Sequence, residues 1–403
     1  MIDLIKKIFN RKGVDNAIYL CVFILTIFGI VMIGSAAVGQ TATKGPTFAT
    51  ITMLKQAIFV AIGYGLMFFF ARFFKKKWIT YSSSWVLYAI SIPFLLVCLL
   101  WSDTKGAHAW IKIAGFTIQP SEFVKIIMIL FLSFHFGQLE EMCVIPRNTS
   151  KKQKEELQLR KAWFCILRPI LLSLVIFFII GFLQKDLGSG FIFAIICMVM
   201  FFVTPRPYYN KYKKVALIAL AGLAVLGIFG ATFILKDYQL GRIYTWLDPL
   251  DDPINGSWQL VNGLISYSYG GLIGKGFGSS VQKYGYIPES HNDFITAIIY
   301  EELGLVGFLL FLIPYCYIIY KMFTYGNKIQ DTKSKLILYG IGTYFFAHLL
   351  INVGGVTGFI PMTGVPLLLV SSGGSSTWAA MLAIGIAQSI IGRYNRDQLK
   401  EQI

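Results

Sequence analysis

The sequence predicts an all-α, polytopic membrane protein with about ten transmembrane helices and both termini in the cytoplasm. The chain has 403 residues, of which 56% are hydrophobic and only 14% are charged. Soluble domains carry about 25% charged residues, and disordered chains are poor in apolar residues. The composition argues against both classes and favours a single integral-membrane domain over residues 1–403.

The second observation is the length of the apolar segments. A helix needs about 20 apolar residues to cross a bilayer. Most segments are apolar on all sides, as expected where lipid and other helices surround them. The predicted spans are 17–37, 52–71, 81–101, 121–137, 166–183, 189–204, 215–235, 294–320, 336–358 and 377–392.

The third observation is the position of the positive charges. Most of the 36 Lys and Arg residues fall on one predicted side of the membrane. By the positive-inside rule this side is cytoplasmic, so the net charge of +16 reflects topology and nucleic-acid binding is not expected. No cleavage site follows the first apolar run, which is expected to be retained as a span. The basic side comprises both termini and the loops near 72–78, 138–165, 205–214 and 321–335, with an exposed helix predicted over 147–161.

Metal and disulfide chemistry are not predicted by the spacing of the cysteines and histidines. The six Cys residues form no CxxC pair, and the four His residues form no HxxxH or HExxH pattern. We therefore expect the cysteines to act as small buried hydrophobes, with neither a disulfide framework nor a zinc site.

Two outer segments are unusual. The loop 236–293 is rich in Gly, Tyr, Trp and acidic residues, and so long a loop in a compact bundle is usually functional. The segment 359–376 carries no charge but is broken by Pro361, Pro366 and two glycines. It is predicted to be partly re-entrant, because irregular backbone at membrane depth must be covered by protein or line a cavity.

Polar residues near membrane depth are costly and often functional. Glu122 and Lys125 are three residues apart at the start of a span, after Pro120 and Ser121, which favour a helix N-terminus. They could form an interfacial salt bridge or a charged wall of a substrate cavity. Asp186 could form a turn between two spans or belong to a site.

Acidic residues also gather at both ends of the long outer loop. Arg242 is followed by Asp248, Asp251 and Asp252, whose spacing matches no EF-hand pattern. Asp293 enters a span and could be its N-cap, or a general base strengthened by partial desolvation. Glu301 and Glu302 lie further along the same span, where a buried structural pairing or a protonated state is favoured over direct catalysis.

These clusters, in this order, resemble the SEDS family of peptidoglycan glycosyltransferases (FtsW, RodA and SpoVE). The likeness covers nearly the whole chain, and its motifs are specific in combination. The matching pieces are GAHAWI (106–111), IQPSEFVK (118–125), KDLGSG (185–190), DPLDDPINGSWQL (248–260), GGLIGKGFGSSVQK (270–283), IPESHNDFITAIIYEELGLVG (287–307) and the stretch 352–376.

The resemblance implies that the protein polymerises lipid II into β-1,4 glycan strands outside the cytoplasmic membrane of a bacterium, releasing undecaprenyl pyrophosphate. The proposed catalytic acid of the family falls on Asp293. A carboxylate there could take the proton of the acceptor 4-hydroxyl as it attacks the anomeric carbon, which is inverted in a single displacement.

The resemblance also implies substrate contacts and partners. Glu122 and Lys125 match the charged pair of the family, and Lys125, Arg242 and Lys283 are candidates to stabilise pyrophosphate charge. Gln119, Ser121, Asp186 and Glu289 complete the expected substrate-binding set. A divalent cation, Mg²⁺ or Mn²⁺, is left open as cofactor. The expected partners are lipid II, the nascent glycan strand, a class B penicillin-binding protein and other divisome or elongasome membrane proteins.

The sequence departs from the family at several positions, and alternatives stay open. Ala109, Lys185, Leu368 and Ser372 stand where relatives often have other residues. The stretch GSSVQKYGYIPE resembles FtsW-type or SpoVE-type proteins, whereas TGVPL is often RodA-like. The FtsW branch is favoured, with roles in sporulation or elongation also open. A lipid II flippase is a second candidate function, disfavoured because the polar clusters face outward, and a non-catalytic scaffold that recruits the penicillin-binding protein is a third.

Overall fold

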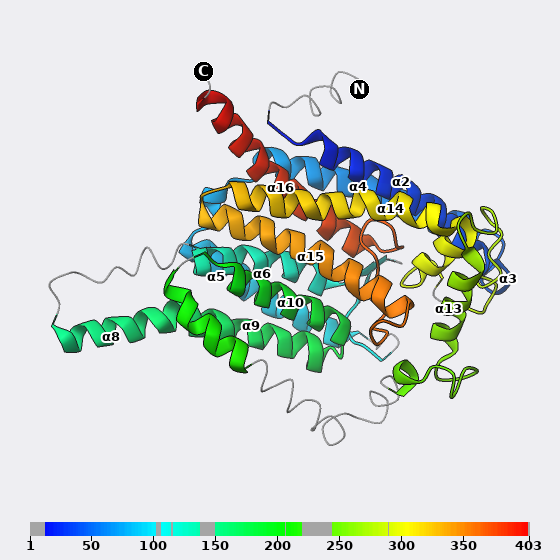
Figure 1. Ribbon diagram of the computed structural model, residues 1–403, viewed down its shortest axis with the longest axis horizontal. Coiled ribbons are helices and arrows are strands. Elements are labelled where there is room, and N and C mark those ends of the chain that lie inside the picture. The colour runs from blue at the N-terminus through cyan, green and yellow to red at the C-terminus, as the bar shows by residue number, and fades with distance from the viewer. Residues whose placement is uncertain are drawn as a thin grey trace.

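The computed structural model describes residues 13–101, 106–113, 116–137, 150–205, 207–219, 244–288 and 290–401. Within these ranges the chain is a helical bundle (Figure 1). In this described part of the chain, eight helices or continuous helical segments are long and apolar enough to cross a membrane, and α10 (Leu187–Val203) is a shorter apolar helix. The predicted multi-pass fold is confirmed. The eight are α2 (Asn16–Val38), α4 (Phe48–Phe73), α5 with η2 (Tyr81–Leu100), α6 (Pro120–Gly137), α8 to η4 (Lys151–Leu183), α14 (Ile295–Lys328), α15 (Thr332–Val356) and α16 (Gly374–Glu401).

Each predicted span except 215–235 coincides with one of these helices. Residues 210–219 are helical, but residues 220–235 lie outside the described part of the chain. The segment Lys151–Leu183 is α8 (Lys151–Ala162) and α9 (Arg168–Phe178), each followed by a π-helical turn, η3 (Trp163–Leu167) and η4 (Ile179–Leu183).

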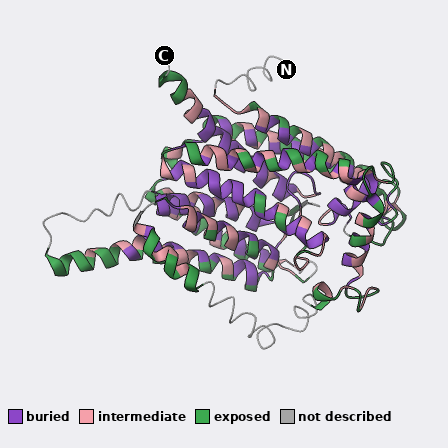
Figure 2. Ribbon diagram, viewed as in Figure 1, coloured by how far each residue is buried: buried purple, intermediate pink, exposed green. Residues whose placement is uncertain are grey.

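Burial separates a central layer from lipid-facing helices (Figure 2). Most residues of α6, α15 and α16 are buried, whereas α4 and α5 expose apolar side chains such as Leu54, Ile62 and Val86. In water such exposure would be unfavourable, but lipid tails are an apolar solvent for it.

The ends of the bundle differ in structure (Figure 1). The start of α2, the end of α16 and the exposed α8 lie at one end, as the predicted topology requires. Ser150 caps α8 in a reciprocal capping box with Gln153, which agrees with the predicted exposed helix. The other end carries α3 (Thr41–Lys44), α13 (Trp258–Gly270) and the loops around them.

A short β-hairpin was not predicted. Strands β1 (Ile111–Ile113) and β2 (Phe116–Ile118) pair antiparallel, with Lys112 opposite Thr117. The hairpin leads through Gln119 directly into α6, and thereby positions the start of that helix.

Helix α14 is interrupted at Gly304, whose φ of 61° and ψ of −155° are not helical. The backbone of the outer loop pairs with α14 on both sides of this break. Lys275 N donates to Glu301 O at 2.9 Å, and Leu305 N donates to Gly271 O at 3.1 Å. The loop thus supplies hydrogen bonds that the interrupted helix cannot form internally.

The segment 357–373 is non-helical and enters the bundle, which agrees with the predicted re-entrant segment. Its residues 367–371 are buried, and the carbonyls of Leu369 and Val370 would lie 2.8 Å from a Cβ placed on Gly29, near the middle of α2. A glycine in α2 therefore permits this close backbone approach.

Candidate active site

Asp293 lies where the outer loop joins α14. The N-cap position of α14 is Phe294, so the expectation that Asp293 is the N-cap is wrong. Its backbone carbonyl accepts a hydrogen bond from Asn352 Nδ2 at 2.8 Å. Its Oδ2 would lie 3.3 Å from a Cβ on Gly364, in the re-entrant segment. Asp293 is half-buried at a junction of three elements.

The residues before Asp293 are fixed to α2, to Gln40 just after it, and to the re-entrant segment. Gln40 Nε2 donates to Pro288 O, and Ser290 Oγ donates to Ala36 O at 3.3 Å. Ser372 N donates to His291 O at 3.0 Å. Asp293 is therefore carried by a segment that neighbouring elements hold on both sides.

Glu122 and Lys125 form a buried ion pair at the start of α6. Lys125 Nζ lies 2.7 Å from Glu122 Oε1, and the two side chains are 0% and 1% exposed. Tyr344 OH donates to Glu122 Oε2 at 2.8 Å, and His348 Nε2 lies 3.5 Å from the same oxygen. The salt-bridge interpretation is confirmed. A direct contact with substrate would require the bundle to open here and stays a prediction.

Gln119 and Asp186 meet beside this pair. Gln119 Nε2 donates to Asp186 Oδ2 at 2.7 Å, and Asp186 Oδ1 caps α10 by accepting from Ser189 N at 3.0 Å. Ser121 Oγ lies 3.5 Å from Ser189 Oγ. Asp186 therefore has a structural role as a helix cap and also joins α10 to the start of α6.

The re-entrant segment connects the buried pair to Asp293. His348 Nδ1 lies 3.1 Å from Pro366 O, and because a carbonyl only accepts, Nδ1 is the donor. Asn352 Nδ2 donates to Val365 O at 2.8 Å as well as to Asp293 O. Sequence reasoning missed Tyr344, His348 and Asn352. Their spacing of four residues along an apolar helix was the available signal.

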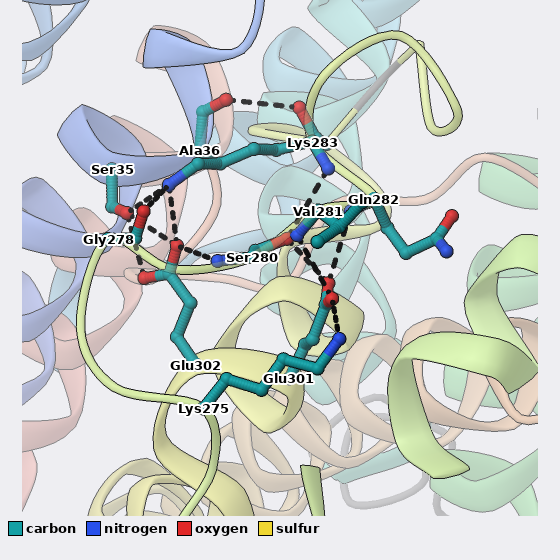
Figure 3. Close-up of polar contacts among 11 residues, drawn as sticks. Ser35, Ala36, Lys275, Gly278, Ser280, Val281, Gln282, Lys283, Glu301 and Glu302 are labelled. Carbon is teal, nitrogen blue, oxygen red and sulfur yellow. Dashed lines mark hydrogen bonds and ion pairs between the residues drawn. The ribbon is translucent and has the colours of Figure 1, made fainter. Parts of the chain in front are cut away.

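Lys283 lies in a different buried cluster (Figure 3). Its Nζ is 2.8 Å from Glu302 Oε1 and donates to Gly278 O at 2.7 Å and to Ser35 Oγ at 3.2 Å. Lys283 is 1% exposed, so its role with pyrophosphate stays a prediction. Glu301 accepts from Val281 N at 3.0 Å and pairs with Lys275. The structural interpretation of Glu301 and Glu302 agrees with these contacts.

Arg242, Glu289 and Asp252 are further charged residues that the sequence singled out. Arg242 and Glu289 lie outside the described residues. Asp252 accepts from Gly256 N at 2.9 Å, and this bond, followed by those from Asn255, lowers the pKa of its carboxyl. Asp252 thus stabilises a turn. In the described ranges no three His, Cys, Asp or Glu side chains converge to hold a metal.

Comparison with known proteins identifies relatives over almost the full length. Stage V sporulation protein E of Bacillus subtilis (strain 168) is 31% identical, covering 96% of this chain and 99% of the relative. A probable peptidoglycan glycosyltransferase FtsW of Geobacter metallireducens is 29% identical, covering 94% and 95%.

Solved structures share the fold. One matching chain has a TM-score of 0.71 at 24% identity, covering 95% of this chain and 98% of that chain. Its structure is described as "Structural coordination of polymerization and crosslinking by a peptidoglycan synthase complex". RodA, a rod shape determining protein of Thermus thermophilus, matches with a TM-score of 0.62 at 21% identity, covering 94% and 97%. The family model for FtsW, RodA and SpoVE, described as "Cell cycle protein", matches residues 15–396. The resemblance predicted from the motifs is thereby confirmed, and the chain belongs to the FtsW/RodA/SpoVE family.

Proposed function

We propose that this protein is a peptidoglycan glycosyltransferase that polymerises lipid II into β-1,4 glycan strands and releases undecaprenyl pyrophosphate. Relatives that cover more than nine tenths of the chain are named as probable peptidoglycan glycosyltransferases of the FtsW type. Their names favour a role in cell division. Sporulation is the alternative, supported by the stage V sporulation relative.

The observation that carries the proposal is the position of Asp293. Its carboxylate lies at the junction of the outer loop, the re-entrant segment and α15, where Gly364 leaves room beside Oδ2. In the proposed reaction Asp293 removes the proton of the acceptor 4-hydroxyl while that oxygen attacks the anomeric carbon. The pyrophosphate leaves from the opposite face, so one displacement inverts the configuration and no covalent intermediate is required.

The surrounding polar residues are proposed to bind substrate. Gln119, Ser121 and Asp186 adjoin the re-entrant segment, because a Cβ on Gly188 would meet Thr363 O at 3.1 Å. Glu122, Lys125, Arg242, Lys283 and Glu289 complete the proposed set. Lys125 contacts the network leading to Asp293 through His348.

The proposed location is the cytoplasmic membrane of a bacterium, with Asp293 outside the cell. The proposed partners are lipid II, the growing glycan strand and a class B penicillin-binding protein that supplies the transpeptidase. This proposal is supported by the fold shared with a chain of a peptidoglycan synthase complex. Other divisome or elongasome membrane proteins are also proposed as partners.

The test is lipid II polymerisation by the purified protein, with and without a class B penicillin-binding protein that cannot itself polymerise. Asp293→Asn should lower the rate by at least about a hundredfold, the range expected for loss of a general base. The matched control is Asp331→Asn, the same change at the opposite end of the bundle, which should leave the rate unchanged. Glycan strands made by Asp293→Asn at the normal rate would support the polymerase function but contradict the role of Asp293 as general base. No strands from the wild type, together with lipid II translocation in vesicles, would favour the flippase.

A further inference from the structure

Helix α15 carries a row of three polar residues, Tyr344, His348 and Asn352, spaced four residues apart and therefore on one face. Tyr344 and His348 contact Glu122, His348 and Asn352 contact the re-entrant segment, and Asn352 also contacts the backbone of Asp293. One helix face thus joins the buried ion pair to the proposed base.

We propose that Asn352 is a positioning residue for the reaction, holding Asp293 at a fixed distance from the re-entrant segment. This inference rests on the proposed glycosyltransferase function. Asn352 does not act on the substrate itself. It joins two stretches of backbone, one carrying Asp293 and the other carrying Gly364, on which a Cβ would lie 3.3 Å from Asp293 Oδ2.

The hydrogen bonds of Asn352 define this role. The side chain is 3% exposed, and its Nδ2 donates to Asp293 O and to Val365 O, both at 2.8 Å. An amide nitrogen has two protons, so both are used in bridging the two carbonyls. An aspartate in this place would put an oxygen against two carbonyl oxygens and could not form the bridge.

The same geometry gives the buried pair a way to affect the reaction without touching substrate. His348 holds Pro366 O, the residue next to the one held by Asn352, and its other ring nitrogen lies 3.4 Å from Lys125 Nζ. A change at Glu122 or Lys125 would therefore shift the re-entrant segment through His348. The position of Asp293 relative to Gly364 would then change as well.

The experiment measures kcat and KM for lipid II polymerisation by the full chain with its penicillin-binding partner. Asn352→Asp should lower kcat by about a hundredfold, the size expected for a misplacement of about 1 Å. KM should stay within about twofold, because ground-state binding is retained. The control is Asn262→Asp, a buried asparagine whose Nδ2 donates within α13 to Trp258 O, and its kcat should be near that of the wild type.

A second pair of variants covers the case in which Asn352→Asp fails to fold. Gly364 and Gly358 have similar φ angles of 71° and 74°, so an alanine strains the backbone equally at both. Only the added Cβ at Gly364 would crowd Asp293 Oδ2, whereas that at Gly358 would meet Leu260 at 3.6 Å. Gly364→Ala should therefore have a lower kcat without a matching rise in KM. Gly358→Ala should have a kcat close to that of the wild type.

Two outcomes would overturn the role of Asn352. One is wild-type kcat in a folded Asn352→Asp variant. The other is equal kcat in Gly364→Ala and Gly358→Ala. A wild-type protein that makes no strands would instead contradict the proposed function, and the positioning role would fall with it.

Discussion

The buried pair of Lys283 and Glu302 yields a prediction that separates two roles for Lys283. The side chains are 1% and 0% exposed, and their charged atoms lie 2.8 Å apart. Removing one partner of a buried ion pair costs about 3–5 kcal/mol, because the other charge stays buried without compensation. In Lys283→Met, Glu302 would still accept from Ser35 Oγ and Ser280 N. We therefore expect the free energy of unfolding to fall by an amount near the lower end of this range, about 3 kcal/mol.

The assay is denaturant unfolding in detergent, followed by tryptophan fluorescence. The control is Lys275→Met, whose lysine is 30% exposed and pairs with Glu301 at 3.2 Å. Lys275 reaches solvent, and without it the buried Glu301 would still accept from Ser280 Oγ, Val281 N and Gln282 N, so this variant should lose less stability than Lys283→Met. The double variant Lys283→Met with Glu302→Gln removes both charges and should recover much of the loss.

The reasoning would be refuted if Lys283→Met were no less stable than Lys275→Met. Activity of the double variant then decides the role of Lys283. A stable, active double variant means that Lys283 stabilises the loop that pairs with α14. A stable but inactive one means that Lys283 contacts substrate, as the family resemblance implies.

Three further predictions concern the glycines Gly304 and Gly29 and the carboxylate of Asp331, at the end of the bundle opposite Asp293. Gly304→Ala should destabilise the protein strongly, because its Cβ would lie 2.5 Å from Gly274 N; the unfolding midpoint measures this, and an unchanged midpoint would contradict the break in α14. Gly29→Ala should displace the re-entrant segment from α2 and lower polymerisation, since its Cβ would lie 2.8 Å from two carbonyl oxygens; proteolysis of residues 357–373 would report the displacement. At Asp331 burial raises the pKa, but hydrogen bonds from Ser334 and the charge of Lys76, 3.1 Å away, outweigh it and lower the pKa. The stability that this carboxylate contributes is present above its unfolded pKa of about 3.9 and is lost as the pH falls through the lower folded value. Asp331→Asn should therefore be less stable at pH 7 and lose less on acidification, and parallel unfolding curves against pH would contradict this.

The sequence alone predicted the helices because a span is defined by its own apolar residues. The Lys and Arg bias predicted a common side for both termini, and α2 and α16 do begin and end at one end of the bundle. The prolines and glycines of 359–376 predicted an irregular segment, which the buried, non-helical backbone confirms.

Contacts between distant residues could not be predicted in the same way. Glu122 and Tyr344 are 222 positions apart, and nothing in either local sequence specifies the other. Gly304 lies in an apolar run that fits a continuous helix, and its left-handed φ depends on the loop that pairs with it. His348 showed no ligand spacing, because its partners come from α6 and from the re-entrant segment.

The break in α14 also limits how much of this helix can lie within the hydrocarbon core of a bilayer. As a continuous helix its 34 residues would measure about 51 Å, whereas the hydrocarbon core of a bilayer is about 30 Å thick. The part beyond Gly304 measures about 36 Å and is long enough to cross by itself. With that part in the hydrocarbon core, the turns from Ile295 to Gly304 would extend beyond it and place Asp293 up to about 15 Å higher. In the proposed reaction, the length of this stub sets how far from the lipid surface a membrane-anchored sugar extends to meet the carboxylate, and removing one turn would lower that level by about 5.4 Å.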